Sequence, residues 1–340
     1  MKLGLGLRQD SLSPVGNRST LTAEAEKLGL DSIWTSEVAG HDALTTLAWL
    51  GRSTTRIRLG TGFCQISARS PSAMAMAAMT LDHLTAGRAF IGLDMAGPEV
   101  DEGWFGRPFA DPLAVVEEYV SIVRLAMDRG RALKFEGKHF AIPAQSGMGL
   151  AKPLKSIVHP LRKRIPIILN GDSYRSRLLA CGIADGWLAS LCIPGVAVRR
   201  FPRTESVGQI SSSNASDSFE MIADVPVAIN DNLEEAIDSV RLLVADRIGR
   251  LVERSVDLPS EELADLGFMD ALLKVHEQWR SGNRSQAAAA VPTSLVQLVS
   301  LVGSKEKIRD DLNTWAESPV TTLLIDCEID TLRTMAELTS

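Results

Sequence analysis

The sequence has little of several features that mark special classes of protein. Its 340 residues include five histidines, four cysteines and no apolar run near the ~20 residues that a membrane helix needs. The histidines show neither HxxxH nor HExxH spacing, so the sequence predicts no metal site. The cysteines stand far apart, which is typical of buried free thiols and not of a disulfide framework. They are Cys64, Cys181, Cys192 and Cys327.

An excess of charge of one sign is also lacking. With 36 basic and 42 acidic side chains the formal net charge is −6, which gives no general attraction to nucleic acid or to an anionic membrane. The first residues, MKLGLGLRQD, contain no long apolar core and no small-residue cleavage site. We therefore expect a soluble, cytoplasmic protein. Its length and its 45% apolar content predict a globular enzyme with a large core.

The chain instead alternates short apolar runs with longer amphipathic runs. Strands are predicted over eight segments, 2–7, 31–36, 56–62, 89–93, 165–170, 186–191, 221–229 and 320–326. Helices are predicted after most of them. One is the methionine-rich run 72–84, which follows Pro71 and ends before Gly87. Strands that are apolar throughout are typical of parallel sheets covered on both faces.

Eight such units predict a (β/α)8 TIM barrel that spans 1–340 as one domain, and an open doubly wound sheet is the alternative. Three insertions interrupt the alternation. Residues 130–164 contain KFEGKHFAI, which predicts a hairpin with Gly137 in its turn. Residues 203–218 are polar and rich in serine, which predicts a mobile loop. Residues 250–310 are predicted to add helices.

Several blocks of sequence, in order, resemble one known family. They include IWTSEVAGHDALTTLAWLGRSTTRIRLGTG, TLDHLTAGRAFIGL, AGPEVDEGWFGRPF, IPIIL and IADGW. Together they are similar to the bacterial luciferase-like family, and specifically to its branch of coenzyme F420-dependent oxidoreductases. The resemblance implies a (β/α)8 barrel with insertions, with a flavin or deazaflavin bound at the carboxyl ends of the strands.

The resemblance also implies a homodimer, formed through barrel helices near the second and third units. The helix predicted at 72–84 offers Met74, Met76 and Met79 as adaptable apolar surface for that contact. Packing of the same side chains against the barrel is the alternative.

The family pattern implies site residues after the second and third strands. The end of the third strand, here Gly62–Phe63 with Gln65 close behind, often carries a non-proline cis peptide or a bulge that presses against the cofactor ring. Glu37 and His41 follow the second strand and would face the cofactor, to hold a substrate or pass a proton.

Further candidates follow the fourth and fifth strands. Glu99, near Gly97 of the cofactor-binding loop, would face the same mouth, although family members often have glutamine at its position. The fifth-strand loop resembles a phosphate site at a helix start. Its candidate residues are Gly171, Asp172, the N-cap Ser173 and the basic Arg175. An ordinary capped helix explains the same residues.

The sequence departs from the family in these loops. GLDMAG stands where the family usually has GLGVSG, which places Asp94 in tight quarters. Ser173–Tyr174 replaces the usual glycine–proline, directly after Asp172. A carboxylate beside a bound phosphate is repulsive unless it is paired or solvated.

Three functions therefore stay open. The leading one is an oxidoreductase that transfers a hydride between coenzyme F420 and an unidentified small organic substrate, with the protein supplying orientation and a proton donor. The alternative is an FMN-dependent monooxygenase of the same superfamily. The third is a cofactor-free barrel with a binding or assembly role, which Asp94 and Asp172 favour and Gly62, Phe63 and Gly97 oppose.

Overall fold

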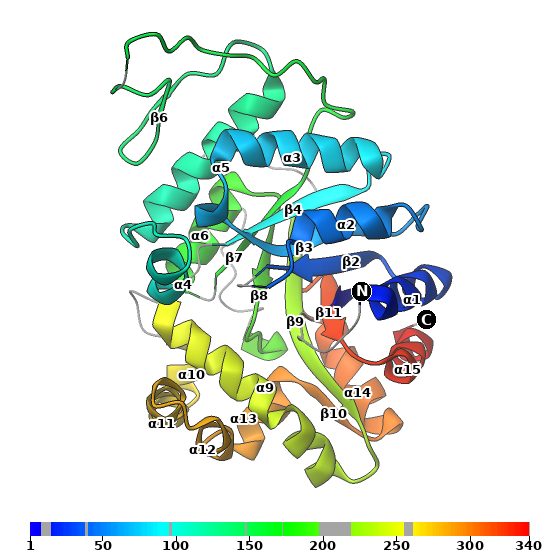
Figure 1. Ribbon diagram of the computed structural model, residues 1–340. Coiled ribbons are helices and arrows are strands. Elements are labelled where there is room, and N and C mark those ends of the chain that lie inside the picture. The colour runs from blue at the N-terminus through cyan, green and yellow to red at the C-terminus, as the bar shows by residue number, and fades with distance from the viewer. Residues whose placement is uncertain are drawn as a thin grey trace.

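The protein folds as a closed barrel of parallel strands with helices around it (Figure 1). The computed structural model describes residues 1–7, 15–37, 40–94, 97–146, 148–171, 173–196, 219–254 and 261–339. The loop predicted at 203–218 and the candidate Asp172 lie outside these residues. Within them, no helix combines the length and apolar character needed to cross a membrane.

Eight strands build the barrel. They are β1 (Lys2–Leu7), β2 (Ser32–Ser36), β3 (Arg58–Gln65), β4 (Ala89–Asp94), β7 (Ile167–Asn170), β8 (Gly186–Ala189), β9 (Glu220–Ile229) and β11 (Thr322–Asp326). Each pairs in parallel with its neighbours, and β9 pairs with both β8 and β11, so the sheet closes on itself. The TIM-barrel prediction is confirmed and the open-sheet alternative is wrong. A ninth strand, β10 (Leu301–Gly303), pairs with the end of β9.

Helices cover the outside of the barrel and extend it on one side (Figure 1). Those of the first half are α1 (Val15–Lys27), α2 (Ala43–Gly51), the 3-10 turn η1 (Ile66–Ala68), α3 (Pro71–Leu84), α4 (Pro98–Gly103) and α5 (Pro112–Asp128). Those of the second half are α6 (Tyr174–Ile183), α9 (Leu233–Arg254), α10 (Glu261–Asp265), α11 (Met269–Arg280), α12 (Arg284–Ala289), α13 (Thr293–Val299), α14 (Lys305–Ala316) and α15 (Ile329–Thr339). The predicted helical insertion at 250–310 is thus present as the end of α9 and α10 to α13, which share a second apolar core.

Apolar side chains fill both faces of the strands, as continuous apolar runs require. Those that point outward pack against the helices, while a smaller cluster fills the barrel interior. The interior cluster consists of Trp34, Phe90, Ile168, Leu188, Ile222 and Leu324, with Phe63 packed against it. Gly60 makes room for this filling, because a Cβ there would lie 1.8 Å from the Phe90 ring.

An ion network closes the amino-terminal end of the barrel. Arg58, at the start of β3, donates to Asp31 before β2 and, through two nitrogens, to Glu220 at the start of β9. Its guanidinium also lies 5.3 Å from the centre of the Phe90 ring. Three strands that are distant in sequence are therefore tied together beneath the apolar filling.

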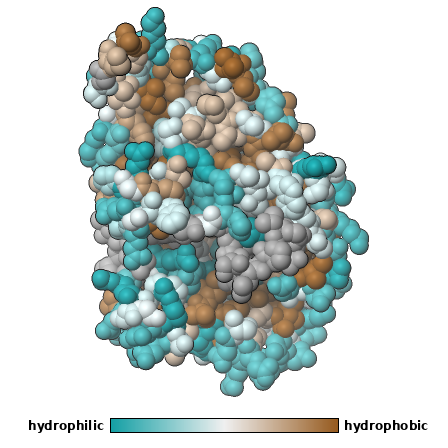
Figure 2. Space-filling view, in the orientation of Figure 1, coloured by the Kyte–Doolittle hydropathy of each residue, from teal (hydrophilic) through white to brown (hydrophobic). Residues whose placement is uncertain are grey.

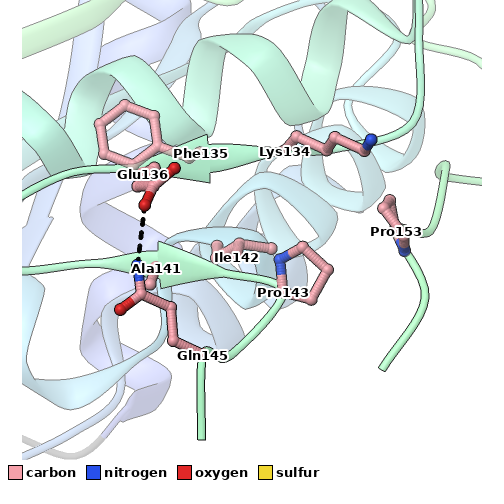
Figure 3. Close-up of a pocket in the computed structure, with 8 residues that line it drawn as sticks. All are labelled: Lys134, Phe135, Glu136, Ala141, Ile142, Pro143, Gln145 and Pro153. Atoms are coloured by element: carbon pink, nitrogen blue, oxygen red, sulfur yellow. Dashed lines mark hydrogen bonds between the residues drawn. The ribbon is translucent and has the colours of Figure 1, made fainter. Parts of the chain in front are cut away.

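The insertion 130–164, which we call the arm, projects beyond α3 and α5 (Figure 1). Its hairpin of β5 (Phe135–Glu136) and β6 (Ala141–Ile142) is antiparallel, which confirms that prediction. A surface hollow of about 550 Å³ lies on the hairpin between Phe135, Ile142 and Pro153 (Figure 3). This hollow lies on the arm and not among the strand ends that line the barrel mouth.

Candidate active site

The third strand reaches the barrel mouth through a bulge. Thr35 and Ser36 of β2 pair with Thr61 and Phe63, so Gly62 is an extra residue in β3. A Cβ on Gly62 would lie 2.4 Å from Ser36 Oγ, which explains why glycine stands there. The expected bulge is therefore present. Of the two features that the resemblance implied, a cis peptide or a bulge, the structure has the bulge, and the cis bond of the described residues is Ile142–Pro143.

Glu37 is buried just past the end of β2 and binds the bulged strand. Its backbone N–H donates to Phe63 O at 3.0 Å, and its carboxylate accepts the N–H of Gln65 at 3.1 Å. Gln65 is also buried and donates from Nε2 to Glu37 O at 3.3 Å. Two sequence candidates therefore meet in one compact unit at the mouth.

Arg69 completes this unit, and the sequence analysis did not single it out. It follows η1 and donates through both terminal nitrogens to the two oxygens of Glu37. One of these nitrogens also pairs with Asp42, the N-cap of α2. Burial works against the charge of the guanidinium, yet Glu37 and Asp42 raise the pKa of Arg69 above its ordinary value. The only signal for this role in the sequence was a lone basic residue between a strand and a helix-starting proline.

Cys64 lies within the same strand end and is fully buried. Burial, together with the neighbouring Glu37, raises the pKa of the Cys64 thiol far above its ordinary value. A thiol held in its neutral form is a weak nucleophile. Cys64 therefore serves packing, as expected for the isolated cysteines of this chain.

Asp94 ends β4 at the same mouth and is buried, with 7% of its surface exposed. It accepts a hydrogen bond at 3.2 Å from Nδ2 of Asn170, the last residue of β7. The other amide atom, Asn170 Oδ1, is buried and has no hydrogen-bond partner within the described ranges, and the same holds for Gln65 Oε1. The tight placement expected for Asp94 is thus observed.

The fifth-strand loop begins α6 with a capping box. Ser173 accepts the N–H of Ser176 at 3.1 Å, and Ser176 Oγ accepts the N–H of Ser173 at 3.1 Å. Gly171 packs closely against Ser176, where a Cβ would lie 2.3 Å from its side chain, and its carbonyl accepts a hydrogen bond from Trp187. Arg175 is exposed in the first turn of the helix. The capping box of an ordinary helix start is therefore present in the described residues of this loop.

The remaining candidates lie at the surface around the mouth. His41 is exposed just before α2, and Glu99 is exposed in the first turn of α4. Gly97 is the N-cap of α4, with an extended backbone that any residue can adopt. The structure thus separates three buried side chains at the mouth, those of Glu37, Gln65 and Asp94, from exposed groups that solvent reaches.

Comparisons with known proteins agree with this geometry. The family model for luciferase-like monooxygenases matches residues 6–322. A Mycobacterium tuberculosis protein, provisionally named a coenzyme F420-dependent oxidoreductase, is 36% identical over 96% of this chain and 94% of its own length.

Solved structures extend the similarity to the fold. The F420-dependent tetrahydromethanopterin reductase of Methanopyrus kandleri superimposes with a TM-score of 0.78 at 19% identity, over 99% of this chain and 97% of that one. The oxygenating part of a diketocamphane monooxygenase from Pseudomonas putida, in complex with FMN, gives 0.67 at 19% identity, over 99% and 97%. With the family model covering nearly the whole chain, the protein belongs to the luciferase-like monooxygenase family.

Proposed function

We propose that the protein is a coenzyme F420-dependent oxidoreductase that reduces or oxidises a small organic substrate at the carboxyl-terminal mouth of the barrel. The observation that carries the proposal is the match along nearly the whole chain to the F420-named mycobacterial relative. Barrel enzymes of this architecture place their sites in the loops after the strands, where the buried side chains of Glu37, Gln65 and Asp94 lie.

The residues of the mouth fit a flat tricyclic ring with a polar edge. Phe63 and the interior cluster below it offer an apolar floor. Asn170 Oδ1 lacks a partner in the described part of the chain, so a ring N–H can supply the missing hydrogen bond. When bound, the deazaflavin supplies hydride transfer at one ring carbon.

A hydride transfer needs a matching proton on the substrate. Histidine is the side chain best suited to proton transfer near neutral pH, and the exposed imidazole of His41 stands beside the mouth, so we assign it the proton. Glu99, on α4, is the second group that can hold a polar substrate there. Glu37 is less suited to proton transfer, because both of its oxygens are bound by Arg69.

We place the phosphate of the cofactor at the start of α6, where backbone N–H groups and Ser173 gather. Arg175 adds positive charge near this helix start. An FMN-dependent monooxygenase is the second candidate, favoured by the shared fold of the FMN-bound Pseudomonas enzyme.

The test is an absorption and fluorescence titration of the purified protein with F420 and, separately, with FMN. We expect F420 to bind with micromolar or better affinity and FMN to bind more weakly. Preference for FMN would make the monooxygenase the better conclusion. Failure of both to bind would support a barrel with a binding or assembly role.

We also propose that the protein forms a homodimer, and we place the contact on the arm and α3. Met74 and Met79 pack in the core, so the alternative was correct for them, while Met76 is 63% exposed. Further large apolar side chains are exposed on the arm, Met148, Leu150, Leu154, Ile157 and Leu161. Figure 2 shows brown hydrophobic surface gathered at this end of the molecule.

Monomeric proteins rarely leave apolar patches of this kind in water. Light scattering at micromolar concentration should therefore give twice the chain mass. Replacing Leu154 and Ile157 by serine should convert the dimer to monomer. A wild-type monomer would contradict this assignment.

A further inference from the structure

We propose that Arg69 is a positioning residue, which fixes the bulged end of β3 in the shape that the mouth presents to its cofactor. It acts through Glu37 and does not itself carry a proton. The inference rests on the proposed function only for the identity of the cofactor, since the geometry it explains belongs to the protein alone.

The contacts form a chain from α2 through Arg69 to β3. Arg69 binds both oxygens of Glu37, and Oε1 of the same carboxylate accepts the Gln65 N–H. The second oxygen also accepts the N–H of Ala43 at 3.4 Å, at the start of α2. A carboxylate with this many donors has a single orientation available to it. Gln65, the residue that ends β3, is therefore held by an ion pair and not only by strand pairing.

The backbone of Arg69 is fixed from a different direction. Its carbonyl accepts a hydrogen bond at 3.1 Å from the hydroxyl of Tyr119, a residue of α5 whose surface is fully buried. A fork of two donors on a fixed backbone sets the direction of the partner carboxylate more strictly than one ammonium group does. Because α5 fixes the backbone of Arg69 and Arg69 fixes Glu37, the position of α5 determines where the loop after β2 lies.

A bulge needs this support because it interrupts regular pairing. The extra residue Gly62 leaves the ladder between β3 and β4 broken from Gly60 until Cys64. Phe63 lies within the interruption and Gln65 just beyond it, and both belong to the proposed cofactor site. Loosening the end of β3 would therefore move the floor and the edge of that site together.

Four variants separate positioning from plain stability. Arg69→Met removes the positive charge, and Arg69→Lys keeps the charge without the two-pronged geometry. Glu37→Gln/Arg69→Met removes both charges of the pair, including the buried carboxylate. Arg162→Met is the matched control, because Arg162 forms an equally forked pair with the buried Asp82, on the outer side of the barrel.

The first measurement is native-state amide hydrogen exchange, which needs no cofactor. We expect exchange within 62–66 to become at least tenfold faster in Arg69→Met, with a smaller change in Arg69→Lys. Exchange of these amides in Arg162→Met should equal that of the wild type. Unchanged exchange at 62–66 in Arg69→Met, or an equal increase in the Arg162→Met control, would overturn the inference.

The second measurement is F420 affinity together with the midpoint of urea unfolding. The double variant should regain stability lost in Arg69→Met, since no buried charge is left unpaired. Its F420 dissociation constant should stay at least tenfold above that of the wild type. Wild-type affinity in the double variant would mean that Arg69 serves stability alone. A wild-type protein that binds no F420 would refute the proposed function, while the exchange result would still decide the role of Arg69.

Discussion

Both ends of the barrel hold charged groups that are at least partly buried, but the two ends differ in how their polar atoms are paired. At the amino-terminal end, Arg58 binds Asp31 and Glu220 and lies over the ring of Phe90. At the carboxyl-terminal end, Arg69 and Glu37 are equally well paired, yet amide oxygens of Gln65 and Asn170 nearby lack partners within the described chain. At the lower end the Arg58 network pairs its own charges, whereas at the upper end the amide oxygens of Gln65 and Asn170 can still accept hydrogen bonds from a ligand.

Unpaired buried polar atoms cost free energy and are therefore uncommon in folded proteins. Gln65 Oε1 and Asn170 Oδ1 are two such atoms at the mouth, where a ligand can supply the missing donors. The same difference explains why changes at the lower end should act on stability and changes at the mouth should act on binding.

The largest expected effect is at the lower end. Replacing Arg58 by methionine leaves Asp31 and Glu220 close together without their shared cation. Lys2 Nζ lies 3.5 Å from Asp31 and offsets part of the resulting loss of stability. Breaking a buried pair in this way costs about 3 kcal/mol. Urea unfolding should show the decrease, while F420 affinity of the folded protein stays near the wild-type value.

The control for this change is Arg250→Met. Arg250 pairs with Asp246 one turn away on α9, and its side chain is 48% exposed. Exposed pairs of this kind contribute roughly 0.5 kcal/mol or less. Equal losses for both variants would show that burial of the Arg58 network is not what stabilises the lower end.

The second effect concerns binding at the mouth. Asp94→Gly should strengthen F420 binding about tenfold, close to 1.4 kcal/mol, because it opens room beside the ring. If space is the cause, the gain should depend little on salt, and Asp94→Asn, which keeps the size, should not show it. Dissociation constants at two salt concentrations decide this. Weaker binding in Asp94→Gly would instead make Asp94 a group that holds the ligand.

The sequence alone predicted the eight-stranded barrel and part of the candidate site. Apolar runs located all eight barrel strands, because strands buried on both faces leave a plain signal. The third strand was predicted to end at 62 and ends at Gln65, since an apolar pattern does not show where a bulge lengthens a strand. Glu37 was identified because the loop after the second predicted strand resembles the segment of the family that faces the cofactor.

Roles that depend on distant partners could not be predicted in this way. Arg69 lies 32 positions after Glu37, and nothing local indicates that its side chain turns back to the previous loop. Likewise, no pattern in the sequence told that Met76 would be exposed and Met79 buried on the same helix. Such contacts depend on the crossing of α2, α3 and α5, which forms only when the barrel closes.

A smaller effect is expected away from both ends, where the arm joins α5. Glu118 accepts the N–H groups of Lys138, His139 and Phe140 at 2.7 to 2.9 Å. Burial opposes the charge, yet these three donors hold the pKa of Glu118 below its ordinary value. Glu118→Gln should cost about 1 kcal/mol, as expected for hydrogen bonds to a partly exposed charge.

Hydrogen exchange at residues 138–140 should become faster in that variant and stay unchanged in the neighbouring Glu117→Gln, whose side chain is exposed. F420 affinity should not change, because the arm lies apart from the mouth. A change in F420 affinity would show that the arm influences the cofactor site.

The variant with the smallest expected effect, Asp42→Asn, tests whether ion pairs at the mouth contribute to stability. Asp42 caps α2 by accepting the Thr45 N–H at 2.6 Å and also pairs with Arg69. Burial raises its pKa, but Thr45 and Arg69 outweigh this, so the pKa of Asp42 lies below its ordinary value. A carboxyl group with a lowered pKa stabilises the fold above its unfolded-state pKa of about 3.9, and this contribution disappears as the pH falls through the folded-state value.

Asp42→Asn separates the charge from the cap, because asparagine caps helices as well as aspartate does. The side chain is 39% exposed, so we expect a loss of only about 0.5 kcal/mol in unfolding free energy at pH 7. The difference between variant and wild type should narrow steadily as the pH falls below about 4. Urea unfolding at a series of pH values measures it. A difference that stays constant into acid would assign the loss to packing, and the pairing at the mouth would then serve geometry alone, in contrast to the Arg58 network at the opposite end.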